Sequence, residues 1–368
     1  MERHSIFDIQ RLGIIMSPDP SRPEEAEGVL NPAAARGPDG QLYLFPRVVG
    51  PGNYSRIGIA RVLFDANGDP VGVERLGYAL EPTEAYELRP EQGTGGCEDP
   101  RVTFVAALRR YVMAYAAWGP SGPRLALAVS KDCLSWERLG LVRYEHEPEL
   151  LVDFNDYDNK DGAFSPEVVI RPDGTACFGF IHRPMYTARE HAPPRIEKPL
   201  PSIWVSFCDA GKAMRDVSAL TRVHGHRLGI DPAHPWEHLR IGLGTPPIRT
   251  HLGMMVIYHG VSGELTKSSE GGNVVNYSAG VVFFETGSDG GIHYRSDVPI
   301  MIPETAEETS GVVNNVVFPT GLDDRGNGVI DIYYGMADLH IGAARMRLPD
   351  ELPPLAMEAA EKVGIAQP

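Results

Sequence analysis

The chain has 368 residues, a hydrophobic fraction of 42% and a formal net charge of −15 at pH 7. This composition is typical of a globular protein, and the negative charge argues against general binding to nucleic acid or an anionic membrane, since both require a basic face. The length exceeds that of one ordinary compact core, so two domains or one large repeat architecture are expected.

The first residues and the cysteines indicate the compartment. Residues 1–10 lack the charged and then apolar layout of a signal peptide. No segment approaches the ~20 apolar residues of a membrane span. The cysteines show neither a Cys-x-x-Cys pair nor histidines at zinc spacing, so we interpret them as free thiols and predict a cytoplasmic protein without a metal site. These four cysteines are Cys97, Cys133, Cys177 and Cys208.

Strand-forming runs recur along the chain in five similar units. They cover residues 41–64, 101–130, 167–207, 247–284 and 315–346. Successive units lie roughly 60 to 80 residues apart, which is long enough for a four-stranded sheet with its loops. We therefore predict an all-β fold, a five-bladed β-propeller with a central active-site pocket, although periodicity alone leaves a pair of β-sandwiches open.

The predicted propeller divides the chain into three parts. Residues 1–30 are assigned to an N-terminal extension and residues 31–346 to the propeller domain. Residues 347–368 form a C-terminal tail, whose segment Leu355-Ala-Met-Glu-Ala-Ala-Glu-Lys favours a short helix. That helix could dock on its own propeller or on another subunit, so a homo-oligomer remains open.

Polar residues bracket the second and third strands of several units. In a propeller these positions converge on the central pocket from different blades. A single such residue more often has a surface or core role, but several at equivalent positions of a repeat favour ligand binding. Because most of them are basic in an acidic chain, they predict a pocket for a small anion such as phosphate. The set comprises Arg56, Arg124, His182, Arg183, His259 and Asp338.

The stretch Gly95-Gly96-Cys97-Glu98-Asp99-Pro100-Arg101 places two adjacent carboxylates on a turn at the start of a strand, beside a cation. Carboxylates held in this way suit general acid–base chemistry on a sugar. A plain turn between strands is the alternative, because Gly-Gly and Asp-Pro are ordinary turn formers.

An ordered series of short motifs resembles glycoside hydrolase family 130, which contains β-mannoside phosphorylases and related β-mannosidases. The matching segments run in the family's order from about residue 31 to residue 345. They are Asn31-Pro-Ala33, Ser55-Arg-Ile-Gly-Ile-Ala60, Gly96-Cys-Glu-Asp-Pro-Arg101, Glu137-Arg-Leu-Gly140, Lys160-Asp-Gly-Ala-Phe-Ser-Pro-Glu167, His182-Arg-Pro184, Thr245-Pro-Pro-Ile-Arg-Thr250, Tyr258-His-Gly-Val261, Val317-Phe-Pro-Thr-Gly321 and Tyr333-Tyr-Gly-Met-Ala-Asp338.

The resemblance implies a five-bladed propeller and an inverting phosphorylase. Such an enzyme cleaves terminal β-mannosides of manno-oligosaccharides with inorganic phosphate, gives α-mannose 1-phosphate, and needs phosphate as co-substrate but no cofactor. Asp99 is implied as the general acid, acting through a hydroxyl of the mannose. The resemblance further implies that mannose is held by Asn31, Arg56, Lys160 and Asp338, and that phosphate is surrounded by Arg124, Arg138 and His259.

The alternative is an inverting β-mannosidase of the same family, which uses water and a glutamate base. Phosphate is already a nucleophile and needs fixed cations, whereas a hydrolase needs a second carboxylate ~6.5–9.5 Å from the acid. The presence of Arg124 and Arg138 favours the phosphorylase, while Glu264 is the candidate base for the mannosidase. A non-catalytic sugar-binding propeller is disfavoured, because Asp99 and the basic set occur together.

Two further expectations concern the surroundings of the sugar. Ser165 stands where the family commonly has a large neighbour of the sugar site. Aromatic side chains are candidates for stacking on the acceptor sugar, although each is more often simply packed. These aromatic candidates are Trp118, Tyr157, Tyr186 and Trp236.

Overall fold

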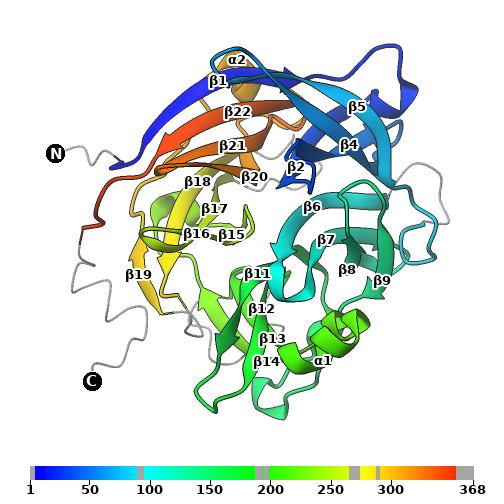
Figure 1. Ribbon diagram of the computed structural model, residues 1–368, viewed down its shortest axis with the longest axis vertical. Coiled ribbons are helices and arrows are strands. Elements are labelled where there is room, and N and C mark those ends of the chain that lie inside the picture. Colours follow the sequence, from blue (N-terminus) through cyan, green and yellow to red (C-terminus); the bar gives the residue numbers. More distant parts are fainter. Residues whose placement is uncertain are drawn as a thin grey trace.

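Small antiparallel sheets are arranged radially around a common centre (Figure 1). The computed structural model describes residues 5–88, 95–186, 193, 199–264, 274–286 and 291–353. Strand pairing within these residues gives four sheets, the largest of which contains two blades joined where Tyr54 and Ser55 pair with Gly95 and Gly96. The described strands therefore form five blades, and the predicted all-β propeller is confirmed.

Each blade is a meander that runs outward from the centre. Blade 1 consists of β2 (Gly28–Arg36), β3 (Leu42–Gly50), β4 (Tyr54–Phe64) and β5 (Pro70–Leu80). Blade 2 consists of β6 (Gly95–Val105), β7 (Arg110–Gly119), β8 (Gly122–Ser130) and β9 (Glu137–Leu141). Blade 3 consists of β11 (Asn159–Ile170), β12 (Ala176–Pro184), β13 (Ile203–Asp209) and β14 (Arg222–Ile230), with the short β10 (Arg143–Tyr144) beside β14.

The inner strand of blade 4 is interrupted. β15 (Arg240–Leu243) and β16 (Ile248–Thr250) both pair with β17 (Gly253–Glu264), which is followed by β18 (Val274–Phe284) and β19 (Ile292–Arg295). Pro246 and Pro247 lie between the two short strands, and a proline cannot donate to a strand ladder. Blade 5 contains β20 (Val317–Gly326), β21 (Val329–Met336) and β22 (His340–Arg347).

The outer strand of blade 5 comes from the other end of the chain. β1 (Asp8–Met16) pairs antiparallel with β22, from Asp8 opposite Arg347 to Met16 opposite Ile341, and lies beside it in Figure 1. The expectation that residues 1–30 form an extension outside the propeller is therefore wrong. The start of the chain closes the ring, and β2 already begins at Gly28.

Short helices occupy some of the connections, and among the described residues no helix is long and apolar enough to cross a membrane. The α-helices are α1 (Ala210–Arg215) and α2 (Ala306–Thr309). The 3-10 helices are Pro23–Glu25, Ala106–Leu108, Pro148–Leu150, Phe154–Asp156, Val217–Thr221 and Pro235–Glu237. The predicted helix after Leu355 lies outside the described residues.

The hydrophobic core lies between the blades. Separate clusters of buried side chains fill the gaps between successive blades, for example Val112, Leu127, Phe164 and Phe180 between blades 2 and 3. Similar clusters join blades 1 and 2, 3 and 4, 4 and 5, and 5 and 1. Each sheet is therefore buried on both faces, which explains why its strands are near-continuous apolar runs.

Candidate active site

A cavity of about 790 Å³ lies at the centre of the propeller. Every blade contributes polar or aromatic side chains to its wall. Blade 1 contributes Asn31 and Arg47, blade 2 Asp99 and Trp118, and blade 3 Lys160, Asp161 and Arg183. Blade 4 contributes Arg240, His259 and Tyr277, and blade 5 contributes Phe318 and Asp338, which lies two residues after the end of β21.

Three of these side chains are directed into the cavity by the same backbone conformation, a residue with positive φ at a bulge in the inner strand. Asn31, Asp99 and Asp161 have φ angles of 45°, 47° and 58°. Each lies where the inner strand of its blade breaks register with the next strand. Such bulges redirect a side chain, and Asn and Asp tolerate the left-handed backbone better than other non-glycine residues. Asp338, with φ 55°, follows the end of β21 in the same conformation.

The Asp99 carboxylate is buried and held from the neighbouring blade. Its Oδ1 accepts hydrogen bonds from Asn31 Nδ2 at 2.9 Å and from Arg47 Nη1 at 3.3 Å. Burial alone would raise the pKa of Asp99, but the charges of Arg47, Lys160 and Arg101 outweigh it and hold the pKa below its usual value. In the free protein this carboxyl is therefore ionised at neutral pH.

Glu98, the adjacent carboxylate, faces the same cations from within the fold. It accepts from Arg47 Nη2 at 2.7 Å and from Lys160 Nζ at 3.1 Å, and its side chain is fully buried. Glu98 does not line the cavity. It therefore neutralises and orients two cations that line the cavity, without lining the cavity itself.

Arg101 ties three blades together behind the cavity. This buried side chain donates to the backbone carbonyl of Asp99 at 2.8 Å and to the Asp161 carboxylate at 3.1 Å. It also donates to the carbonyls of Leu243 and Gly244 in blade 4. The arginine of the Glu-Asp-Pro-Arg motif therefore fixes the turn that carries Asp99.

A cationic wall is formed by blades 3 and 4. Arg183 Nε donates to Asp161 at 2.6 Å, and Arg240 Nη2 donates to the Tyr277 hydroxyl at 2.5 Å. Within the described part of the chain, Arg240 forms no ion pair with a carboxylate. His259, whose Nε2 is 3.7 Å from Asp161, has no hydrogen-bond partner for either ring nitrogen among those residues.

Burial determines the charge state of two further groups. It lowers the pKa of His259 to about 3, although the negative charge of Asp161 acts in the opposite direction, so the imidazole is neutral at pH 7. Burial also raises the pKa of Asp338 to about 6, where the cation Arg47 opposes the shift and the charge of Asp99 adds to it. Asp338 is therefore the cavity carboxyl that titrates closest to neutral pH.

The cavity brings together five of the eight predicted site residues. Asn31, Asp99, Lys160, His259 and Asp338 line it. Their assignment by resemblance matches this placement, although the placement does not by itself test their roles.

The other three predicted residues do not line the cavity. Arg56 lies over the rings of Tyr54 and Tyr78, with Nε 3.5 Å from Glu81. Arg124 donates to Asp158 at 2.7 Å, near the rim. Arg138 Nε donates to the buried carboxylate of Glu87 at 2.8 Å. Because each of these guanidinium groups is directed to other partners, their placement gives no support to the expectation that Arg56 holds mannose and that Arg124 and Arg138 surround phosphate, and these roles stay predictions.

Sequence reasoning missed Arg47, Arg240 and Tyr277. Arg47 precedes Arg56 by nine residues on the antiparallel partner strand, and nothing in the local sequence tells which of the two faces the centre. His182, predicted in the pocket, is instead buried in blade 3, where it contacts Asn159 and Ser206. In a strand, a shift of one residue reverses the face to which a side chain points.

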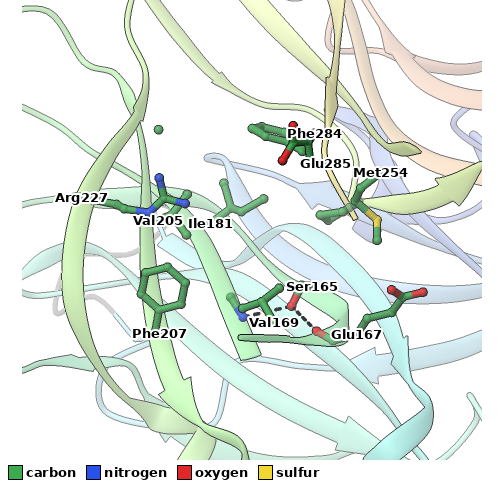
Figure 2. Close-up of a pocket in the computed structure, with 13 residues that line it drawn as sticks. Ser165, Glu167, Val169, Ile181, Val205, Phe207, Arg227, Met254, Phe284 and Glu285 are labelled. Atoms are coloured by element: carbon green, nitrogen blue, oxygen red, sulfur yellow. Dashed lines mark hydrogen bonds between the residues drawn. The ribbon is translucent and has the colours of Figure 1, made fainter. Parts of the chain in front are cut away.

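Ser165 does not adjoin the sugar site. It lies at a separate, mostly apolar cavity of about 80 Å³ between blades 3 and 4, which Ile181 and Phe284 also line (Figure 2). Its hydroxyl donates to the carbonyl of Glu167 at 2.9 Å and accepts from the amide of Gly179 at 3.0 Å. The expectation placing Ser165 beside the sugar is therefore wrong.

Of the aromatic candidates, Trp118 lines the central cavity, with Lys160 Nζ 4.5 Å from its ring centroid. Tyr157 and Tyr186 pack into the core between blades 2 and 3, and Trp236 packs against Tyr258. Glu264 is exposed at the end of β17 and is not part of the cavity wall. Trp118 is thus the aromatic candidate placed to meet an acceptor sugar.

Comparison with known proteins gives the context of this site. The profile of the family described as beta-1,4-mannooligosaccharide phosphorylase, glycoside hydrolase family 130, matches residues 1–352. A 1,2-beta-oligomannan phosphorylase of Thermoanaerobacter sp. (strain X514) is 28% identical over 342 residues, covering 91% of this chain and 95% of that protein. A beta-1,2-mannobiose phosphorylase of Listeria innocua is 26% identical over 73% of this chain and 62% of that protein.

Solved structures show the same fold. The beta-1,2-mannobiose phosphorylase of Listeria innocua, in complex with beta-1,2-mannobiose, superimposes with a TM-score of 0.66 at 23% identity, covering 92% of this chain and 97% of that one. A putative glycoside hydrolase from Bacteroides ovatus gives a TM-score of 0.67 at 24% identity. With the profile matched over nearly its whole length, the chain belongs to glycoside hydrolase family 130.

Proposed function

We propose that this protein is an inverting phosphorylase that cleaves terminal β-mannosides with inorganic phosphate and releases α-mannose 1-phosphate. The relatives from Thermoanaerobacter and Listeria innocua named above are mannoside phosphorylases. The observation that carries the proposal is the cationic wall, in which Arg240 has no carboxylate partner and His259 has two unbonded ring nitrogens among the described residues. Buried polar atoms without partners, such as the two ring nitrogens of His259, are costly unless a ligand satisfies them.

Phosphate satisfies these donors. A guanidinium offers paired donors that match the oxygens of an oxyanion, and the neutral His259 can donate one more hydrogen bond. Arg183 is anchored by Asp161, so its orientation is fixed before the ligand arrives. Such preorganised cations would hold phosphate in line with the anomeric carbon.

The acid lies on a different blade from this wall. In the proposed reaction a phosphate oxygen forms a bond to the anomeric carbon, the glycosidic bond breaks, and the departing oxygen takes up a proton that originates from Asp99 and passes through a mannose hydroxyl. Asp99 must therefore be protonated first. Bound phosphate brings negative charge into the cavity, which raises the pKa of a nearby carboxyl and so favours the protonated acid.

The mannosidase alternative needs a carboxylate base that faces the acid across the sugar. Glu264 is not in the cavity wall. Asp161 lies between Arg101 and Arg183 at 3.1 and 2.6 Å, and although burial opposes it, these cations hold the pKa of Asp161 well below its usual value. A carboxylate so strongly stabilised in its ionised form is a poor base.

The reaction as proposed uses mannoside and phosphate as substrates and needs no cofactor. A cytoplasmic location is the companion proposal, supported by four cysteines that are buried and unpaired.

Incubation with β-1,2- and β-1,4-linked manno-oligosaccharides, with and without phosphate, tests the function. We expect mannose 1-phosphate from at least one linkage and only when phosphate is present. Free mannose released at the same rate without phosphate would instead support the mannosidase.

A further inference from the structure

Three blades contain the same arrangement around a buried glutamate, which we call the glutamate clamp. The glutamates are Glu87, Glu237 and Glu308, and all three are fully buried. Each carboxylate accepts from the two backbone amides three and four residues earlier, from a tyrosine of the second strand and from an arginine of the outermost strand.

In blade 2 the arginine of the clamp is Arg138. Its Nε and Nη2 donate to Glu87 at 2.8 and 3.1 Å, and the Tyr115 hydroxyl donates to Glu87 at 2.7 Å. The amides of Thr83 and Glu84 add bonds of 2.9 and 3.1 Å. The Nε and Nη2 donors of Arg138 are therefore already occupied by Glu87 within the protein.

The same donors recur elsewhere with different residues. In blade 4, Arg295 and Tyr258 each donate to Glu237 at 2.7 Å. In blade 5, Arg11 Nε and the Tyr334 hydroxyl each donate to Glu308 at 2.8 Å. Because Arg11 and Arg295 occupy the position of Arg138 in their own blades, Arg138 belongs to a repeated structural element and not to the phosphate site.

The clamp of blade 2 differs from the other two because it contacts β6, the strand that contains Asp99. The carbonyl of Glu87 accepts from the amide of Gly96 at 3.0 Å, three residues before Asp99. Gly96 has φ 107° and lies so close to β4 that a Cβ there would be 2.2 Å from the Ser55 carbonyl oxygen. The clamp thus presses the start of β6 against β4, where Tyr54 and Ser55 pair with Gly95 and Gly96.

A second route leads from this contact to the acid. The Ser55 hydroxyl accepts from Arg47 Nε at 2.9 Å, and Arg47 Nη1 reaches the Asp99 carboxylate at 3.3 Å. The backbone that carries Asp99 and the arginine that contacts Asp99 are therefore both held by the same short segment of β4, Tyr54 and Ser55.

We propose that Arg138, through Glu87, is a positioning residue for the catalytic carboxyl of Asp99. Loss of Arg138 loosens the Gly95-Gly96 segment, so that Asp99 and Arg47 no longer hold one geometry. This inference rests on the proposed function, because it assigns Asp99 the task of proton donation.

The test compares Arg138→Met with Arg11→Met, which removes the same donors from the blade 5 clamp. In blade 5 the carbonyl of Glu308 accepts from the amide of Val316 at 2.9 Å, directly before β20. Among the described residues, β20 brings no ionisable side chain to the cavity wall. Two substrates are used: a manno-oligosaccharide, whose leaving alcohol needs a proton, and a nitrophenyl β-mannoside, whose leaving group does not. Rates are measured over a range of phosphate concentrations, together with thermal unfolding.

We expect Arg138→Met to lower kcat on the manno-oligosaccharide by about 10-fold or more, within the range attributed to a general acid, and to change the phosphate KM by less than about twofold. The loss should be much smaller on the nitrophenyl mannoside. Arg11→Met should lose comparable thermal stability while keeping the wild-type ratio of the two substrates.

Equal losses on both substrates, or a phosphate KM that rises while kcat is retained, would overturn the inference. The first result would mean a general loss of structure, and the second a phosphate ligand. Inactivity of the wild-type chain with phosphate would count against the proposed function instead, so the two failures are distinguishable.

Discussion

The amide of Asn31 donates to the carboxylate of Asp99 at 2.9 Å, so the inner strand of blade 1 orients the proposed acid on blade 2. Both residues have a left-handed backbone, which for a non-glycine residue costs on the order of 1–3 kcal/mol. Two strained residues that meet side chain to side chain indicate a site whose geometry is set by the ring and not by either blade alone.

Asp99→Asn removes the proton donor but keeps the shape. Asparagine tolerates the left-handed backbone, and its oxygen can still accept from Asn31 and Arg47. We expect a loss of roughly 10²–10⁴-fold in kcat on manno-oligosaccharides, the usual contribution of a general acid, with the melting temperature little changed. Formation of mannose 1-phosphate measures the rate; a variant that retains most of its activity would remove Asp99 from the acid role.

Arg240→Met tests the cationic wall. A charge-assisted hydrogen bond of about 1.5–3 kcal/mol corresponds to a rise of roughly 10- to 150-fold in the phosphate KM. The matched control is Arg124→Met, because Arg124 is paired with Asp158 and does not itself line the cavity. The phosphate KM of this variant should stay near the wild-type value. The reverse pattern would restore the phosphate role that the sequence suggested for Arg124.

Asp338→Asn should stabilise the protein in a pH-dependent way. Since burial raises the pKa of Asp338 from 3.8 to about 6, ionising it disfavours the folded state as the pH rises through this window. Replacing the carboxyl by a neutral amide should add about 3 kcal/mol to the free energy of unfolding above pH 7, and close to nothing at pH 4.

Chemical denaturation at the two pH values measures this difference. A gain that is equal at both would show that removal of the charge is not its cause. Activity should fall in the same variant, because the cavity loses the carboxyl that the family resemblance predicts to bind the sugar, while stability is gained.

Buried histidines predict loss of stability in acid. Burial lowers the pKa of His182, and also that of His226, below the usual value, and it lowers the pKa of His259 to about 3. Below about pH 6.5 the unfolded chain binds protons that these buried histidines do not bind in the folded state. Stability therefore falls as the pH drops, by at most about 1.4 kcal/mol per pH unit for each such histidine.

The midpoint of urea denaturation between pH 7.5 and 5 measures this slope. His182→Gln should reduce the dependence of the unfolding free energy on pH by the contribution of one histidine. It should also lower stability at neutral pH, because it disturbs the hydrogen bonds to Asn159 and Ser206. An unchanged slope would show that His182 is not one of the responsible groups.

The propeller could be predicted from the sequence because five apolar strand units recur, and Asp99 because its motif is local. Whether the side chain of a given arginine faces the central cavity could not be predicted in the same way. Arg56, Arg124 and Arg138 are in suitable segments, yet their partners Glu81, Asp158 and Glu87 lie 25, 34 and 51 residues away in the chain. Only the pairing of strands shows that these carboxylates reach the guanidinium groups before a ligand does.

The ring is closed by β1, whose partner β22 lies more than three hundred residues later in the chain. During synthesis the first strand must therefore wait, unpaired, until the last blade has left the ribosome. Pairing of such high sequence separation is slow to form, because the entropy of closing a long loop is lost first. A peptide copying residues 8–16, added to a chain that lacks them, would occupy the same edge and could complete the ring from outside.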